Sequence, residues 1–364
     1  MTDRVHSVRF GRRLDDFRVG AVFEHPWEVT VDDGMRALFD ASFLDATPTY
    51  ASRIAAASIG LRDRPLHPLL LLNLGLSFSV HDVSEQAIAH LAYVSVRFPN
   101  ACYAGDTVRA ESIVLGATPT SDASRGIVSV RTNVRTADGN IVCAFERKAL
   151  VPAGRSNAPE GEVREVDARG DIQSLPSLPS EVHAGGAAAA GLRGFGGFWE
   201  DFRVGDVFAH SVGRTVGESE HMQLATLFRN THPLHGDEVY CASESFAKTR
   251  VVYGGLVLAW ALALASRDTA GRALWDMELS DGAHPAPVVA GDTLYAASKV
   301  LAKADHGPHT GTVTLRVVGA KNVESKRLIE SGVDLFAPEK SKGEGKIAEK
   351  VVEITRTLLV RKRG

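Results

Sequence analysis

A histidine, an amide and a pair of glycines in the second half of the chain have the types and spacing for acid–base chemistry. Asn230 precedes His235 by five residues, and Gly254 and Gly255 follow about twenty residues later. An imidazole moves protons near neutral pH, whereas an amide orients a water molecule but cannot act as a base. The glycines open a long apolar run, and a helix beginning there would offer unpaired N–H groups to an oxyanion. These residues predict a site that polarises a carbonyl and transfers a proton beside it.

The chain carries the same segment twice, so its two copies can be compared. Residues Asp16–His25 agree with Asp201–His210 at eight of ten positions, at an offset of 185. Further along, Ala104–Val108 matches Ala290–Leu294 at an offset of 186. A nearly constant offset over such a distance indicates one fold present twice.

The two copies differ where the chemistry is expected. In the first copy Asp45 and Tyr50 take the places of the amide and the imidazole, and Pro68 takes the place of the first glycine. Proline begins a helix comfortably but has no N–H to donate, whereas glycine lets a ligand approach the backbone closely. The second copy is therefore predicted to hold the catalytic site.

Each candidate has a plainer explanation beside the functional one. His235 taken alone could be a structural histidine; the glycine pair and the difference between the copies favour catalysis. His232 could be a pocket wall or a surface residue. Glu218, Glu220 and His221 resemble a metal cluster only loosely and fit better on a short polar helix. No G-x-G-x-x-G follows a predicted strand, so neither a metal nor a dinucleotide cofactor is expected.

The elements that position these residues read as an α+β unit repeated twice. The apolar runs Leu66–Leu76 and Leu256–Ala265 predict buried helices, and a curved antiparallel sheet wrapped around each would bury them. Two such sheets can join edge to edge, which removes exposed edges. Strands are expected at Leu91–Arg97, Thr107–Leu115, Ile127–Val134, Ile141–Val151, Val313–Val318 and Val351–Val360, with a hairpin turn at Ala137–Asn140.

Composition shifts divide the chain into three parts. A first repeat is expected at residues 12–151, a linker rich in proline, glycine and alanine at 152–195, and a second repeat at 196–364. Residues 321–348, rich in lysine, glutamate and serine, are expected to form an inserted surface hairpin or a mobile loop.

Bulk properties exclude several classes of protein. The 364 residues are 44% hydrophobic and 23% charged with a net charge of −3, which gives no support for a nucleic-acid or anionic-membrane partner. No secretory signal or membrane-length apolar run is seen. The three cysteines, Cys102, Cys143 and Cys241, show no metal-binding spacing and fit buried thiols in a cytoplasmic protein. A homo-oligomer is compatible with the sequence.

At these residues the chain resembles the MaoC-type (R)-specific enoyl-CoA hydratase family in its double hot-dog form. That family carries D-x-N-P-[LIV]-H, followed about twenty residues later by a helix opening H-G. Here Asn230-Thr-His-Pro-Leu-His235 keeps the proline, the aliphatic residue and the final histidine. It departs at Asn230 and His232, and Tyr253-Gly254 stands where H-G is usual.

One subgroup, the mesaconyl-CoA hydratases or β-methylmalyl-CoA dehydratases, is more similar. The shared features are His221-Met-Gln, the Asn230-Thr pair, Arg250–Gly255 and Ala290-Gly-Asp-Thr. The resemblance implies a tandem hot-dog hydro-lyase that reversibly hydrates a short, branched, dicarboxylic enoyl-CoA, mesaconyl-CoA to β-methylmalyl-CoA, with a degenerate first half that widens the acyl pocket. It implies catalytic roles for His235, Asn230, Gly254 and Gly255, and substrate contacts from Arg229, Arg250, His232, Tyr253 and Tyr50, with the two arginines as candidates for the free carboxylate.

Two other classes remain open from the sequence. A hot-dog thioesterase would use the same helix start with a carboxylate, Asp237 or Glu238, positioned to direct water at the carbonyl carbon. A non-catalytic protein that binds acyl-CoA would follow if Asn230 marks a decayed acid–base pair. Release of thiol would reveal the first, and binding without turnover the second.

Overall fold

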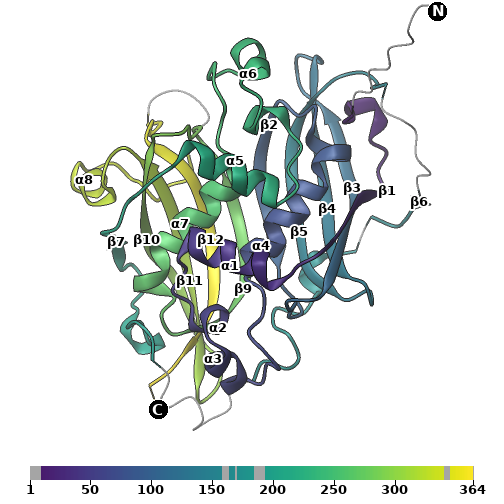
Figure 1. The fold of residues 1–364 in the computed structure, drawn as a ribbon. Coiled ribbons are helices and arrows are strands. Elements are labelled where there is room, and N and C mark those ends of the chain that lie inside the picture. Colours follow the sequence, from purple (N-terminus) through teal and green to yellow (C-terminus); the bar gives the residue numbers. More distant parts are fainter. Residues whose placement is uncertain (1–9, 158–163, 169, 184–192, 340–344, 364) are drawn as a thin grey trace, which may run out of the picture.

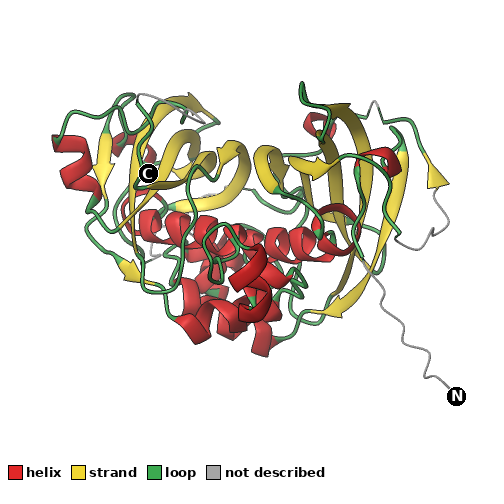
Figure 2. Ribbon diagram, turned by 90° about the horizontal axis from the view of Figure 1, so that it is seen from above, coloured by secondary structure: helices red, strands yellow, loops and turns green. Residues whose placement is uncertain are grey.

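Two long apolar helices lie side by side inside the curve of one antiparallel sheet (Figures 1 and 2). The structure is a computed structural model that describes residues 10–157, 164–168, 170–183, 193–339 and 345–363. Helix α4 (Pro68–Phe78) is buried along its whole length, and α7 (Gly254–Thr269) is buried at most of its positions. Both apolar runs are therefore helices, as predicted. Their side chains belong to one hydrophobic core that continues across both halves of the molecule.

The sheet has twelve strands and an approximate two-fold symmetry of strand order. Its order is β6-β1-β3-β4-β5-β2-β9-β12-β11-β10-β7, with β8 also paired to β10, so the two copies meet where β2 pairs with β9. This junction confirms the edge-to-edge joining predicted from the sequence. The strands are β1 (Ala21–Thr30), β2 (Ala89–Arg97), β3 (Thr107–Pro119), β4 (Arg125–Thr136), β5 (Ile141–Pro152), β6 (Arg164–Glu165), β7 (Val207–Ala209), β8 (Arg214–Thr215), β9 (Ala273–Ala283), β10 (Thr293–Asp305), β11 (Thr310–Lys321) and β12 (Lys350–Arg361).

Shorter helices cover the side of α4 and α7 that faces away from the sheet (Figure 2). They include α1 (Asp33–Phe43) and α5 (Glu218–Leu227), which both contact α7. The other short helices are α2 (Pro48–Ala51), α3 (Arg53–Ser58) and α6 (Glu238–Glu244). The segment 321–348 was predicted to be a hairpin or a mobile loop, and in its described part that prediction is wrong. It contains α8 (Ser325–Glu330), and Leu328 and Leu335 pack on Ala297 and Val318 of the outer sheet. The boundaries of the linker at 152–195 stay a prediction, since residues 158–163, 169 and 184–192 lie outside the described part.

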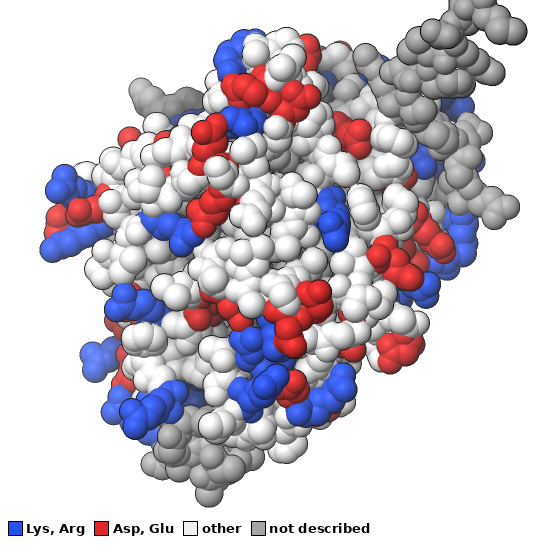
Figure 3. All heavy atoms as spheres, viewed as in Figure 1, with Lys and Arg blue, Asp and Glu red and all other residues white. Residues whose placement is uncertain are grey.

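The distribution of surface charge and the burial of the cysteines agree with what the composition predicted. On the face shown in Figure 3, acidic and basic side chains gather in mixed clusters around a broad uncharged area. All three cysteines are buried and unpaired, as expected. Within the described ranges, no helix has the length and hydropathy needed to cross a membrane.

The same Asp–His–Ser network recurs in both halves, with its aspartate in η2 (Val80–Ser84), just after α4, or near the end of α7. In the first half His25 contacts Asp82 at 2.9 Å through Nδ1 and Ser112 at 2.7 Å through Nε2. The equivalent His210 contacts Asp268 at 2.6 Å and Ser298 at 2.9 Å. Both serines are fully buried, so each network connects elements of the fold.

A buried ion pair with no equivalent in the first half holds β9 against β12. Arg356 donates to Asp276 through Nε at 2.6 Å and through Nη2 at 3.1 Å, and both side chains are almost fully buried. The backbone N–H of Asp276 also donates to the Tyr50 hydroxyl at 3.1 Å. Because both charges are removed from water, each depends on the other for compensation.

Removing either partner of this pair should destabilise the protein strongly. Asp276→Leu or Arg356→Met leaves an uncompensated buried charge, and we expect a loss of about 3–5 kcal/mol in the free energy of unfolding. The double variant, which removes both charges, should recover much of this loss. Urea denaturation followed by circular dichroism measures all three. A single variant as stable as the wild type would contradict the role of the pair.

Candidate active site

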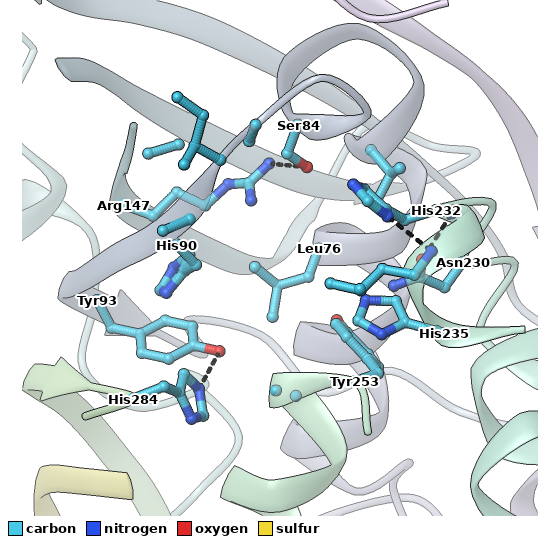
Figure 4. A pocket seen from close by; sticks show the side chains of 18 residues that line it. Leu76, Ser84, His90, Tyr93, Arg147, Asn230, His232, His235, Tyr253 and His284 are labelled. Carbon is cyan, nitrogen blue, oxygen red and sulfur yellow. Dashed lines mark hydrogen bonds between the residues drawn. The ribbon is translucent and has the colours of Figure 1, made fainter. Parts of the chain in front are cut away.

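A pocket opens between the two halves at the N-terminal end of α7, and its wall combines residues from both copies (Figure 4). The second half contributes Asn230, His232, His235 and the first residues of α7, and the first half contributes side chains from α4, β2 and β5. The lining comprises Leu76, Val80, Ser84, Ala87, Ile88, Ala89, His90, Tyr93, Arg147, Ala149, Asn230, His232, Leu234, His235, Tyr253, Gly254, Gly255 and His284.

His235 is held in a single neutral tautomer that suits a base. It ends the short helix η6 (Pro233–His235), and its Nδ1 lies 2.8 Å from the carbonyl oxygen of Val251. A carbonyl only accepts, so Nδ1 carries the proton and the Nε2 lone pair stays available. Burial, with a smaller contribution from the neighbouring His232, lowers the pKa of His235 to about 3. The imidazole is therefore neutral at physiological pH.

Asn230 presents an amide donor to the pocket. Its Oδ1 accepts from the backbone N–H of His232 at 3.0 Å, which closes a tight turn just before η6. That bond assigns Oδ1 to the backbone and leaves Nδ2 facing the pocket beside His235 (Figure 4). The amide of Asn230 can therefore donate to an oxygen in the pocket, and it has no group that could act as an acid or base.

The start of α7 carries the two N–H groups that were predicted to stabilise an oxyanion. Its N-cap residue, Tyr253, makes no side-chain capping bond, and no acceptor is found in the described structure for the N–H groups of Gly254 and Gly255. A β-carbon on Gly254 would lie 3.0 Å from His284 Nε2, and one on Gly255 would lie 2.0 Å from Asn73 Oδ1. Packing therefore requires glycine at position 255. Without side chains on these two residues, the N–H groups of Gly254 and Gly255 remain accessible from the pocket.

His232 and Tyr253 form the wall around the imidazole. His232 Nδ1 accepts from the backbone N–H of Leu234 at 3.1 Å, and burial lowers the pKa of His232 to about 4. The Tyr253 ring lies 5.5 Å from the His235 ring, centre to centre. The structure thus brings together His235, Asn230, Gly254, Gly255, His232 and Tyr253 in one pocket.

Three predicted substrate contacts lie elsewhere. Arg250 is paired with Glu218 and, at 2.9 Å, with Glu238, so its charge is already balanced. Arg229 is exposed just after α5 and does not line the pocket. Tyr50 is buried, with its hydroxyl against the backbone of Asp276. Proximity in sequence to His235 suggested the two arginines, but Arg229 lies at the surface and Arg250 is held by two carboxylates.

Tyr50 occupies in the first half the position that His235 has in the second. The residues around Tyr50 lack the groups needed for the same chemistry. Asp45 repeats the tight turn of Asn230, accepting from the backbone N–H of Thr47 at 2.8 Å. The His67 side chain accepts from the Leu69 N–H at 3.1 Å, so it caps α4, and Pro68 lacks an N–H. The predicted loss of oxyanion donors in the first copy is thus visible as a capped helix start.

Four residues of the opposite wall of the pocket were not predicted from the sequence. Arg147 on β5 and His90 and Tyr93 on β2 come from the first half, and His284, which directly follows β9, comes from the second. The Tyr93 hydroxyl lies 3.3 Å from His284 Nε2 (Figure 4). Burial lowers the pKa of His284 to about 4 and that of His90 well below its usual value. Only the repeat alignment of the final strands could have indicated Arg147.

No aspartate or glutamate of the described chain lines the pocket. Asp237 caps α6, accepting from the Tyr240 N–H at 2.9 Å, and Glu238 pairs with Arg250. A thioesterase that uses either carboxylate is therefore not supported by this geometry. The described residues also contain no group of three or more His, Cys, Asp or Glu side chains suited to a metal ion.

Comparison with known proteins gives one consistent family. The profile of the mesaconyl-CoA hydratase family matches residues 1–332. A mesaconyl-CoA hydratase from Cereibacter sphaeroides is 33% identical over 313 residues, which cover 86% of this chain and 90% of that protein. A β-methylmalyl-CoA dehydratase from Chloroflexus aurantiacus is 31% identical over 315 residues, covering 86% and 89%.

Solved structures confirm the predicted fold. A putative MaoC-domain dehydratase from Chloroflexus aurantiacus superposes with a TM-score of 0.78 at 27% identity, over the full length of both chains. A protein from Mycobacterium tuberculosis described as having a double hotdog fold gives 0.72 at 22% identity, covering 97% of this chain and 98% of that one. The tandem hot-dog architecture is thus established.

The protonation state of His235 can be observed directly. Long-range ¹H–¹⁵N spectra of the histidine rings should show His235 neutral at pH 6 with its proton on Nδ1, because burial and the Val251 carbonyl favour that form. The His235→Gln variant assigns the resonance. Titration of this ring near the ordinary imidazole pKa of about 6.5, or a proton on Nε2, would contradict the geometry.

Proposed function

The chain belongs to the mesaconyl-CoA hydratase family, and on that premise we propose how its pocket carries out the reaction. The protein is a MaoC-type hydro-lyase that interconverts mesaconyl-CoA and β-methylmalyl-CoA. The observation that carries the proposed site is the juxtaposition of a neutral imidazole, His235, with the uncapped start of α7.

The thioester carbonyl binds at the start of α7. Its oxygen accepts from the N–H groups of Gly254 and Gly255, where the positive end of the helix dipole favours negative charge. This polarisation makes the β-carbon of the conjugated thioester electrophilic. It also stabilises the enolate that forms once water has added.

His235 and Asn230 handle the water. The Nε2 lone pair of His235 takes a proton from water as the oxygen bonds to the β-carbon, while the Asn230 amide donates to that oxygen and orients it. The enolate then collapses by taking a proton at the α-carbon. The Asn230 amide has no titratable proton, so the imidazolium of His235 donates the proton to the α-carbon. The histidine thereby ends the cycle neutral.

Two broader statements accompany the mechanism as proposals. The substrate partner is a CoA thioester, for which the apolar, partly polar-lined pocket is suited. Action in the cytoplasm is supported by three unpaired cysteines. A homo-oligomer stays a prediction.

Replacing His235 should abolish most of the turnover. We expect His235→Ala to lower kcat for hydration of mesaconyl-CoA by about a hundredfold or more, because general-base catalysis is lost. The loss of conjugated thioester absorbance measures the rate, and circular dichroism checks that the variant is folded. Turnover within about threefold of the wild type would remove His235 from the mechanism.

The pH profile should lack the acid limb typical of an ordinary histidine. The sequence alone suggested a fall of activity below the usual imidazole pKa, but burial lowers the pKa of His235 to about 3. We therefore expect kcat/KM to stay level from about pH 8 to about pH 5. A fall centred near pH 6.5 would contradict this environment.

Unfolding must be monitored over the same range. Burial holds the pKa of His90, His232 and His284 below the usual value, so they stay neutral while the unfolded chain takes up protons below about pH 6.5. Their contribution to stability is present above that pH and is lost as the pH falls toward the folded-state pKa. Rates are compared only where the protein remains native.

A further inference from the structure

Arg147 is a buried cation that faces the pocket without a counter-ion. Its side chain on β5 belongs to a residue only 4% exposed, and it lines the pocket (Figure 4). Nη2 donates to the hydroxyls of Ser79 at 2.9 Å and Ser84 at 3.4 Å, and Nε has no acceptor in the described structure. Burial lowers the pKa of Arg147 to about 10, which still leaves the guanidinium charged at neutral pH.

The other buried cations of the described chain all have a carboxylate. Arg316 lies 3.0 Å from Glu353, Lys350 lies 2.5 Å from the same residue, and Arg356 lies 2.6 Å from Asp276. Arg36 is paired with Asp33. A buried charge without an opposite charge is costly, so an exception at a pocket wall indicates an anionic group supplied by the ligand.

The internal repeat shows where that anion belongs. Arg147 stands opposite Val130 and Tyr93 in the sheet, and Arg356 stands opposite Leu315 and Leu279, so the two arginines occupy equivalent places. In the second half the guanidinium meets a protein carboxylate, Asp276.

The first half has lost that carboxylate. The residue equivalent to Asp276, at the same offset of 186 as Tyr93 and Leu279, is His90. Both ring nitrogens of His90 lack a partner in the described structure. The position filled by a protein carboxylate beside Arg356 is therefore free for a ligand beside Arg147.

We infer that Arg147 binds the free carboxylate of the dicarboxylic acyl group and selects for it. This inference rests on the proposed function. In Figure 4 Arg147 and His90 lie across the pocket from His235 and Asn230, with Leu76 between them. A substrate whose thioester is held at α7 can direct its other end toward Arg147. A guanidinium forks onto a carboxylate through two N–H groups, which adds geometric selectivity.

Unreactive thioesters test this inference without turnover. Methylsuccinyl-CoA carries the second carboxylate, and 2-methylbutyryl-CoA carries a methyl group in its place. By calorimetry, Arg147→Gln should weaken binding of methylsuccinyl-CoA by at least about thirtyfold and leave 2-methylbutyryl-CoA within about twofold. Arg147→Lys, which keeps a charge but not the fork, should fall between. The matched control is Arg131→Gln, which removes an arginine of β4 paired with Glu146 outside the pocket and should change neither affinity.

Each outcome bears on the inference. Equal weakening of both thioesters would show that Arg147 binds the CoA portion or supports the fold, and unchanged affinities would show that it binds neither; both results overturn it. Thermal unfolding of Arg147→Gln should be no earlier than that of the wild type, because an unpaired buried charge is removed. If Arg147→Gln fails to fold, the Arg147→Lys variant decides. An equal loss of affinity for both thioesters in that variant also overturns the inference.

Turnover separates the inference from the proposed function. With mesaconyl-CoA and 2-methylcrotonyl-CoA as substrates, Arg147→Gln should lower kcat/KM selectively for the dicarboxylic one. If the wild type binds methylsuccinyl-CoA through Arg147 yet hydrates no mesaconyl-CoA, the function fails and the carboxylate site stands. If the wild type hydrates mesaconyl-CoA and the variant does so equally well, the carboxylate site fails and the function stands.

Discussion

The close contact between α4 and α7 beneath one continuous sheet is the constraint on which the site depends. Asn73 of α4 donates from Nδ2 to the carbonyl of Leu69 at 2.8 Å and, at 3.4 Å, to that of Gly255, and only glycine leaves room for its amide there. This contact brings the uncapped start of α7 against the first half of the molecule. The pocket consequently needs both copies: the second carries the proposed base and oxyanion donors, and the first forms most of the opposite wall.

The two copies kept their scaffold and changed their chemistry. Both retain the Asp–His–Ser network, and both retain the arginine of the last strand. The changes are local. In the first copy, Tyr50 stands where the second copy has the imidazole of His235, and it is buried against the backbone of Asp276. The carboxylate of Asp276 also neutralises Arg356. The pocket at the first of the two equivalent positions, lined by Asp45, Tyr50 and His67, thus has a capped helix start and a paired arginine, whereas the second has an open helix start and an unpaired cation.

The sequence predicted the parts of this arrangement that are encoded locally. The apolar runs predicted both central helices, and Gly254-Gly255 with His235 predicted the proposed donors and base. These residues lie in one pocket because the backbone N–H of Val251 donates to the carbonyl of Leu234 just beside it. The pairing of β2 with β9 joins residues far apart in sequence, so nothing local indicated that His90 and Arg147 face His235. The insertion at 321–348 also lengthens the repeat offset before the final strand, which hides the match of Arg147 to Arg356 in a simple comparison.

Charge balance connects the two walls of the pocket. Without ligand, the site holds one cation and neutral imidazoles, and the cation of Arg147 itself lowers the pKa of His90. A substrate with one free carboxylate makes the complex neutral before water adds, whereas a monocarboxylic thioester leaves the cation uncompensated. In the proposed reaction the new charges are then the enolate and the imidazolium of His235, and the enolate forms where the start of α7 and that imidazolium can stabilise it. Selection of the acyl group and stabilisation of the intermediate therefore follow from one arrangement: a positive wall given by the first copy opposite a proton-transfer site given by the second.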